Sequence, residues 1–209
     1  MSKYFCLEGA DGCGKSAQAR RLKQWLQQEG KEVVHVREPG STPLAEALRK
    51  TLLNPRTGAL DPLTEALLFS AARSDTVRRE IRPALQRGAV VVAERCYLSS
   101  YVYQAMAVDD GVDLDLLRRI TTAVHGDARP DLVLLLDVDS AQAAERRSRR
   151  HEDRFEGRGQ EFQERVRQAF LRLAREEPDI TVVDAGRPID EVAADVERAA
   201  GAVLRGWRV

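Results

Sequence analysis

Residues 9–16 constrain the fold more than any other part of the chain. They read Gly9-Ala10-Asp11-Gly12-Cys13-Gly14-Lys15-Ser16, which fits the pattern G-x-x-x-x-G-K-[ST] at every fixed position. The apolar run at residues 4–7 suits a buried strand, and apolar residues recur at helical spacing after the motif until Gly30. Glycines let such a loop curl so that its N–H groups point inward, and the following helix adds its positive end. The stretch predicts a phosphate-binding loop in which Lys15 reaches the β and γ phosphates of a nucleotide and Ser16 holds Mg²⁺.

The length and composition fit one α/β domain over residues 1–209. The balance of charges predicts no strong electrostatic attraction to a partner. Lys plus Arg and Asp plus Glu both number 33, so no overall field recruits nucleic acid or an anionic membrane. The cysteines are three in number and lack C-x-x-C spacing, which favours free thiols over zinc and indicates a reducing, cytoplasmic setting. No apolar run approaches 18 residues, and the start of the chain lacks a signal segment. Histidines 35, 125 and 151 are scattered without metal spacing, and we assign them no role.

Strand and helix patterns alternate along the whole chain. Apolar runs predict five strands, at residues 4–7, 33–36, 89–93, 132–136 and 180–183. Helical patterns fill the intervals, with Pro83 expected to kink or divide one of them and the last three expected at 140–150, 159–176 and 188–204. This alternation predicts an α/β fold: a five-stranded parallel sheet with helices on both faces and ligands at the carboxyl ends of the strands.

Glu94 and Arg95 directly follow the third predicted strand, at the edge where the phosphate loop also lies. A carboxylate there can hold a Mg²⁺-bound water, and the neighbouring guanidinium can clamp a phosphate. Both could instead cap the strand in solvent. We favour the functional interpretation because the phosphate loop precedes this pair.

Phe69 and Arg73 are four residues apart on one predicted helix and share a face. A ring can stack on a base, and a guanidinium, which only donates, suits an oxygen acceptor such as O4 of thymine or uracil rather than the amino group of cytosine. Taken alone, Phe69 suits the core and Arg73 a solvated surface, so the residues by themselves leave this role open. Ser100, Tyr103 and Gln104 could line a sugar or base pocket, with packing as the alternative for the tyrosine.

Residues 146–158 contain six arginines interspersed with acidic residues and Gly157. A solvated charged helix is one interpretation of such a run. We favour a mobile, arginine-rich lid, because a phosphoryl-transfer site needs cations to neutralise the charge of the transferring group.

Taken together, these residues resemble the thymidylate kinase family, nucleoside monophosphate kinases that make dTDP from dTMP. The likeness spans nearly the whole chain. Beside the phosphate loop it rests on Arg37-Glu38-Pro39-Gly40 with Thr42-Pro43, Leu68-Phe69-Ser70-Ala71-Ala72-Arg73, Ser99-Ser100 with Tyr103-Gln104, Pro130-Asp131-Leu132, Leu136-Asp137-Val138-Asp139, and Asp153-Arg154-Phe155-Glu156 followed by Phe162. The resemblance implies a fold of the P-loop NTPase type, transfer of the γ-phosphoryl of Mg-ATP to dTMP, ATP and Mg²⁺ as cofactors, and a homodimer.

The resemblance also implies roles for individual residues on the acceptor side. Arg37 and Arg95 bind the phosphate of dTMP. Asp11 approaches the sugar 3′-hydroxyl, and Tyr103 crowds the position of a ribose 2′-hydroxyl. The residues implied around the base are Phe69, which stacks on thymine, Arg73, which meets O4, and the pocket residues Ser100 and Gln104.

On the donor side, family members without an arginine inside the phosphate loop supply one from the lid. The loop of this chain, at residues 9–16, contains no arginine, so Arg150 and Arg154 are the catalytic candidates from the lid, beside Lys15 and Glu94. Arg146 is expected against adenine, near the loop at residues 185–187.

One departure from the family pattern leaves alternatives open. The family usually has Asp-Arg-Tyr where this chain has Glu94-Arg95-Cys96, and the extra methylene adds a bond of about 1.5 Å beside a metal that demands octahedral geometry. The pair is also similar to that of deoxyribonucleoside kinases, whose carboxylate acts as a base toward a sugar hydroxyl. A third interpretation is a non-catalytic nucleotide-binding module. Arg37 favours an anionic acceptor, and the retained Lys15 and Ser16 favour catalysis.

Overall fold

The structure, a computed structural model, describes residues 2–147, 155 and 158–206. Its centre is one parallel sheet with the strand order β2-β3-β1-β4-β5. The strands are β1 (Lys3–Glu8), β2 (Val33–Arg37), β3 (Val90–Glu94), β4 (Leu132–Asp137) and β5 (Ile180–Asp184). All five predicted strands are confirmed to within two residues at each end.

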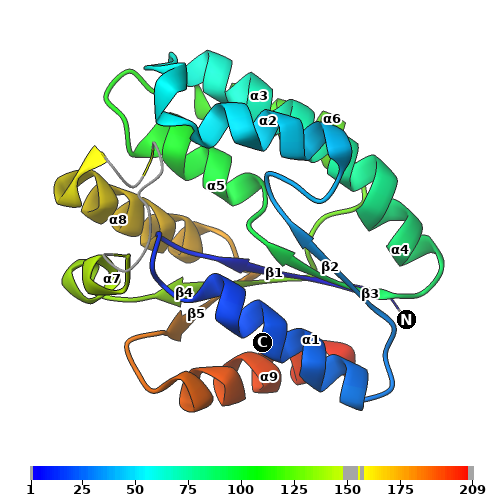
Figure 1. The fold of residues 1–209 in the computed structure, drawn as a ribbon. Helices are drawn as coiled ribbons and strands as arrows, with labels where there is room; N and C mark the ends of the chain where they lie inside the picture. The colour runs from blue at the N-terminus through cyan, green and yellow to red at the C-terminus, as the bar shows by residue number, and fades with distance from the viewer. Residues whose placement is uncertain (1, 148–154, 156–157, 207–209) are drawn as a thin grey trace.

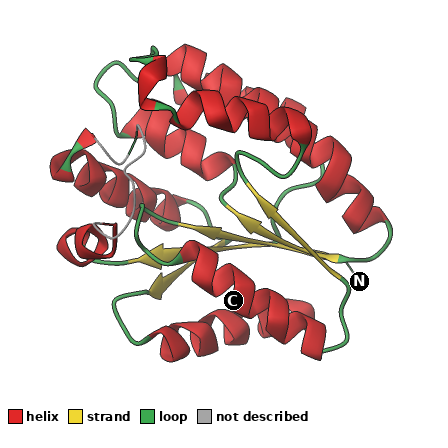
Figure 2. Cartoon of the chain, in the orientation of Figure 1, coloured by secondary structure: helices red, strands yellow, loops and turns green. Residues whose placement is uncertain are grey.

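Successive strand residues enter two separate core layers, as the two-residue repeat of a strand requires. Tyr4 and Cys6 of β1 pack in one layer, whereas Phe5 and Leu7 pack in the other. Helices α1 (Lys15–Gln28) and α9 (Ile189–Leu204) cover the second layer, on the lower face of the sheet in Figure 1. The remaining large helices cover the opposite face, as Figure 2 also shows. The predicted α/β fold is therefore confirmed.

Helices α2 (Pro43–Leu53) and α3 (Pro62–Thr76) lie side by side above the sheet, with the short turn η1 (Pro55–Thr57) between them. Each begins with a capping side chain and a proline in its first turn, an arrangement that satisfies the free N–H groups there. The Thr42 hydroxyl accepts from Ala45 N–H at 3.1 Å, and the Asp61 carboxylate accepts from Thr64 N–H at 3.0 Å. These caps determine where α3 starts, and so which of its residues face the sheet edge.

The helical stretch after α3 is divided as Pro83 predicts. A wider π-type turn, η2 (Val77–Ile81), precedes the short helix α4 (Arg82–Gln86). Proline has no N–H to donate and its ring presses on the carbonyl four residues earlier. A turn with i→i+5 bonding accommodates that crowding.

The segment from Tyr97 to Met106 is helical, which the sequence pattern did not predict. It consists of α5 (Tyr97–Tyr101) and the π-type turn η3 (Val102–Met106). Most of its side chains are buried and the others are half-buried, so the segment shows no amphipathic period. It is followed by α6 (Leu114–His125), α7 (Ser140–Arg147) and α8 (Gln160–Glu176). The predicted lid falls mostly on residues outside the described part of the chain.

The order of the strands reverses beside β1, because the chain leaves β1 toward β2 and leaves β3 toward β4. Ligands of open parallel sheets bind at such a switch point, outside the carboxyl ends of the strands. Here the phosphate loop follows β1, and Glu94 and Arg95 end and follow β3. In the described residues, no helix has both the length and the apolar character needed to cross a membrane.

Candidate active site

The phosphate loop joins β1 to α1 through glycines with left-handed backbone angles. Gly9 has φ 137°, and a Cβ there would lie 2.5 Å from the Leu136 carbonyl oxygen, so a side chain is excluded. Gly14 has φ 101° and caps α1, and a Cβ there would meet nothing within 4 Å, so this side of the loop is open. Lys15 Nζ donates to the carbonyl oxygens of Gly9 at 2.9 Å and Ala10 at 2.8 Å. The ammonium is thus held at the rim of the loop, beside the helix N-terminus where anions bind.

Ser16 and Glu94 meet beside this loop. The Ser16 hydroxyl donates a hydrogen bond to Glu94 Oε2, and His35 Nε2 lies 3.0 Å from Oε1. Burial raises the pKa of Glu94, but the contacts from His35 and Ser16 outweigh it and hold this pKa below its usual value. A hydroxyl and an ionised carboxylate are the hard oxygen donors that Mg²⁺ prefers. The pair therefore fits a magnesium ion, and the longer glutamate side chain still reaches Ser16.

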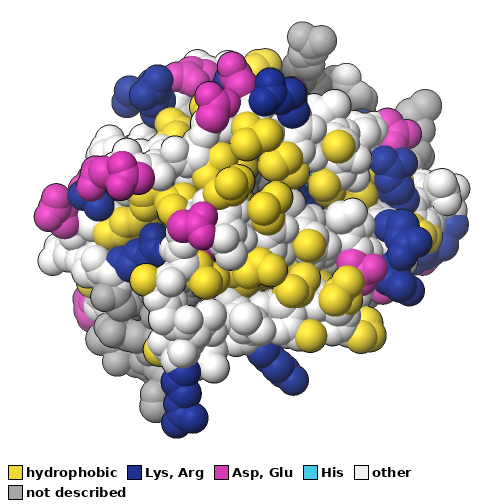
Figure 3. Space-filling view, turned by 90° about the horizontal axis from the view of Figure 1, so that it is seen from above, with side chains coloured by type: hydrophobic (Ala, Val, Ile, Leu, Met, Phe, Trp, Pro, Cys, Tyr) yellow, Lys and Arg dark blue, Asp and Glu magenta, His cyan; other side chains and the backbone are white. Residues whose placement is uncertain are grey.

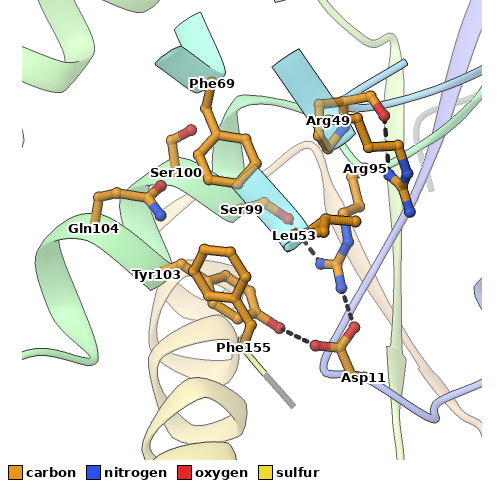
Figure 4. Close-up of a pocket in the computed structure, with 11 residues that line it drawn as sticks. Asp11, Arg49, Leu53, Phe69, Arg95, Ser99, Ser100, Tyr103, Gln104 and Phe155 are labelled. Atoms are coloured by element: carbon orange, nitrogen blue, oxygen red, sulfur yellow. Dashed lines mark hydrogen bonds and ion pairs between the residues drawn. The ribbon is translucent and has the colours of Figure 1, made fainter. Parts of the chain in front are cut away.

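Arg95 lies between the phosphate loop and a second pocket. Its backbone has φ 72°, a conformation rare outside glycine that marks strain at a functional position. The guanidinium pairs with Asp11 and donates to Ser99 Oγ at 3.0 Å (Figure 4). Tyr103 donates its hydroxyl to the other oxygen of Asp11 at 3.2 Å. Burial and the nearby Asp11 raise the pKa of Tyr103, so the phenol keeps its proton.

The second pocket lies beside Arg95 and is lined by side chains from α2, α3, α5 and η3. One wall is aromatic: the Phe155 ring lies 5.8 Å from both the Phe69 and the Tyr103 rings, centroid to centroid. Figure 4 shows these rings turned toward one another, with Gln104 and Ser100 beside Phe69. The pocket is lined by Asp11, Pro39, Arg49, Leu53, Phe69, Arg95, Ser99, Ser100, Tyr103, Gln104 and Phe155. Flat rings beside a few polar groups suit a nucleobase.

Arg73 lies behind this pocket rather than on its wall. Its guanidinium, 4% exposed, donates to Glu38 Oε2 at 2.6 Å and to the Cys96 carbonyl at 3.0 Å. It also donates to Ser100 Oγ at 3.1 Å, and Ser100 does line the pocket. Arg73 therefore connects to the interior of this pocket through the Ser100 hydroxyl.

Arg37 and Arg146 line a larger cavity over the phosphate loop. Arg37 is exposed and donates to Glu46 at 3.0 Å. Arg146 donates to the carbonyl of Ala185 at 3.1 Å, next to the loop expected near adenine. The catalytic candidates Arg150 and Arg154 lie outside the described residues.

Several residues that contact the site were not among the candidates predicted from the sequence, and four of them are Glu8, His35, Glu38 and Glu65. Glu8, fully buried, accepts from the N–H groups of Cys96 and Ser99 at 2.8 and 3.1 Å and so holds the turn after β3. A carboxylate closing a buried strand was the available signal for Glu8, and Glu65 stands four residues before Phe69 on the same helix face. Nothing in the sequence pattern indicated the pairing of His35 with Glu94.

The site combines three features. A glycine-rich loop joins the first strand of a parallel sheet to a helix, Lys15 and Ser16 stand at the start of that helix, and a neighbouring strand supplies a carboxylate. Together these features define a phosphoryl-transfer protein of the P-loop NTPase type. Comparison with known proteins gives the family. Residues 7–196 match the family model described as "Thymidylate kinase". The chain belongs to the thymidylate kinase family, and its activity is that of an ATP-dependent nucleoside monophosphate kinase.

Individual relatives agree with this assignment over nearly their whole length. The chain is 42% identical to a thymidylate kinase of Symbiobacterium thermophilum over 205 residues, which covers 98% of this chain and 95% of the relative. It is 44% identical to that of Deinococcus radiodurans over 195 residues, covering 92% and 93%. The crystal structure of thymidylate kinase from Ehrlichia chaffeensis superposes with a TM-score of 0.78 at 28% identity, covering 95% and 98%. These matches do not favour a nucleoside kinase or a non-catalytic module.

Proposed function

We propose that this site transfers the γ-phosphoryl of Mg-ATP directly to a phosphate oxygen of dTMP, in line and without a covalent enzyme intermediate. One observation carries the proposal. The phosphate-loop cavity and the aromatic pocket share Asp11, Arg49 and Arg95 as lining residues, so a donor in one and an acceptor in the other meet at a cationic wall. An anionic acceptor needs cations to hold it and no base to deprotonate it, so positioning and charge neutralisation supply the catalysis.

Each cationic residue has a distinct part in this mechanism. Lys15 lies at the loop that cradles the donor phosphates, and Arg95 and Arg37 aim the acceptor phosphate. Arg150 and Arg154 remain the candidates for neutralising the transferring group. Ser16 and Glu94 would hold Mg²⁺, which supplies positive charge at the β- and γ-phosphate oxygens when bound.

The aromatic pocket is the proposed site of the thymine and its sugar. Phe69 stacks on the base, while Ser100, supported by Arg73, donates toward O4, and Gln104 contacts the next position on the ring. Tyr103 and Asp11 stand where the sugar would lie. The hydroxyl of Tyr103, held by Asp11 at 3.2 Å, leaves little room for a ribose 2′-hydroxyl.

We propose that the protein is a single domain and that it forms a homodimer through the exposed face of α2 and α3. One sheet with its two core layers supports the single domain. Leu44, Leu63 and Leu67 are 51%, 43% and 52% exposed, and Figure 3 shows apolar side chains gathered on that face. Sedimentation equilibrium tests the dimer: Leu67→Glu is expected to give monomers, and a wild-type monomer would contradict the proposal. Three free, buried cysteines support the predicted cytoplasmic location.

The activity is tested by measuring ADP release from Mg-ATP with dTMP, thymidine, dUMP and dCMP as separate acceptors. We expect fast turnover with dTMP and little with thymidine, because a neutral hydroxyl offers no charge to Arg37 and Arg95. Preference for thymidine would instead make Glu94 a base and refute the mechanism. Binding of ATP without turnover of any acceptor would refute catalysis altogether.

A further inference from the structure

Glu65 is a buried carboxylate whose two oxygens hold two different groups. It lies on α3 with 2% of its surface exposed. Oε1 accepts from Arg158 Nη2 at 2.9 Å, and Oε2 accepts from the side-chain nitrogen of Gln104 at 3.3 Å. Arg158 is itself packed, with its guanidinium carbon 4.8 Å from the centre of the Phe155 ring and 5.0 Å from that of Phe162. The carboxylate is thus clamped from both sides.

This contact decides which way the Gln104 amide faces. A side-chain amide has one end that donates and one that accepts, and the two ends have nearly the same shape. A carboxylate paired with a guanidinium accepts hydrogen bonds and donates none. Only the NH₂ end of Gln104 can therefore face Glu65, which leaves Oε1 for the other side. Within the described chain, no donor is bonded to this Oε1, and Gln104 lines the aromatic pocket (Figure 4).

The neighbouring wall group has the opposite character. Ser100 Oγ accepts from Arg73 at 3.1 Å, so its own hydrogen is free to point into the pocket. The wall thus presents an acceptor from Gln104 beside a donor from Ser100. Thymine and uracil present the complementary pair, a hydrogen on N3 next to an oxygen at position 4, whereas cytosine presents a bare N3 next to an amino group.

We propose that Glu65 is a positioning residue for base selection, which orients Gln104 so that the pocket accepts pyrimidines with a hydrogen on N3 and rejects those without one. The proposal rests on the proposed function of the pocket and adds to it the residue that fixes the direction of the Gln104 amide. Glu65 acts through Gln104 and touches no substrate itself.

The test is Glu65→Gln, which keeps the shape of the side chain but adds a donor. Gln104 can then turn its NH₂ end into the pocket, where it suits the bare N3 of cytosine. We expect the ratio of kcat/KM for dTMP to that for dCMP to fall about 10- to 100-fold, the range for leaving a buried polar group unmatched. The ratio for dTMP to dUMP should stay unchanged, because these two bases share the same hydrogen-bonding edge. If Glu65 had a merely structural role, Glu65→Gln would lower kcat/KM for all three acceptors together.

Arg158→Lys is the matched control, because it disturbs the contact on Oε1 of Glu65 but leaves a cation beside the carboxylate, so the acceptor that faces Gln104 is kept. It should retain the dTMP-to-dCMP ratio even if turnover falls. An unchanged ratio in folded Glu65→Gln would overturn the proposal, and so would a collapsed ratio in Arg158→Lys.

Two further measurements keep the proposal testable if Glu65→Gln does not fold or turnover is absent. Calorimetric binding of dTMP, dUMP and dCMP measures the same selectivity without catalysis, so a failure of the proposed function is distinguishable from a failure of this inference. In the wild-type protein, the Gln104 side-chain amide protons, assigned by NMR against Gln104→Ala, should remain protected from solvent exchange before and after dTMP binds. Amide protons that exchange freely in both states would show that Glu65 does not hold them and would overturn the inference.

Discussion

Replacing Arg73 by alanine should destabilise the protein in a way that depends on pH. Arg73 and Glu38 form a buried ion pair, 4% and 3% exposed, with 2.6 Å between Nε and Oε2. Glu38 Oε1 has no hydrogen-bond partner among the described residues, so the guanidinium is the main compensation for this carboxylate. Burial already raises the pKa of Glu38 above its usual value, and Arg73 opposes that rise. Without Arg73, the folded protein must bury either a bare charge or a protonated carboxyl.

The cost of protonating Glu38 sets the size of the loss of stability. Protonating a carboxyl with an ordinary pKa of 4.5 at pH 7 costs about 3 kcal/mol at 1.36 kcal/mol per pKa unit. Loss of the other hydrogen bonds of Arg73 and the space it leaves add to this, so the free energy of unfolding should fall by 3 to 5 kcal/mol, roughly the range for a broken buried pair. At pH 5 the protonation cost is only about 0.7 kcal/mol. In the variant the folded state binds more protons at Glu38 than the unfolded state, so the deficit narrows as the pH falls.

The assay is urea unfolding of wild type and Arg73→Ala at pH 7 and pH 5. The control is the double variant Arg73→Ala with Glu38→Gln, which removes the carboxyl, so its deficit should hardly change between the two pH values. A deficit of the single variant below about 1 kcal/mol at pH 7, or one that is equal at both pH values, would refute the reasoning, since a broken buried pair typically costs far more.

Under conditions in which Arg73→Ala is folded, the variant should also have a lower preference for dTMP over dCMP, because Ser100 loses its hydrogen-bond donor. An unchanged preference would remove Arg73 from base selection.

Three other perturbations have definite expected outcomes. Lys15→Met should lower kcat about 10²- to 10³-fold with little change in melting temperature, because the ammonium serves the transferring phosphates; near-normal turnover contradicts that role. His35→Phe should raise the Mg²⁺ concentration for half-maximal ATP binding about 10-fold by releasing Glu94, measured by calorimetry; unchanged dependence removes His35 from the site. Burial, aided by the charge of Arg73, lowers the pKa of His125 to about 4, so the unfolded state binds more protons below pH 6.5. Wild type should therefore lose about 2 kcal/mol of stability between pH 7 and pH 5 through this group, and His125→Phe should lose less. Unfolding free energies from urea titrations that change equally with pH in the two proteins would exclude this role of His125.

The phosphate loop and the five strands could be predicted because their signals are local. A glycine pattern that permits left-handed angles lies within eight residues, and each buried strand is a short apolar run bounded by polar residues. The helix from Tyr97 to Tyr101 was missed because it is buried on most sides and lacks a polar face.

Candidate site residues at strand ends could be predicted for a related reason. In a parallel sheet the carboxyl ends share one edge, so Glu94 and Arg95 were expected at the edge that carries the phosphate loop. The strand order then brings them close to the loop, because β3 pairs directly with β1. The general type of ligand followed from this edge together with the motif. Resemblance to a family, rather than the pattern itself, supplied thymine.

The sequence by itself determined the alternation of strand and helix, the phosphate loop and the chemistry at the sheet edge. Only the tertiary structure decided which distant side chains meet there. Because β2 pairs with β3 so that Arg37 is opposite Glu94, His35 falls on the same face two residues away and reaches the carboxylate. Because α3 packs against η3, Glu65 meets Gln104, which is 39 positions later in the chain. Such pairings depend on register and helix packing between remote segments, and these contacts leave no periodic trace in the residues themselves.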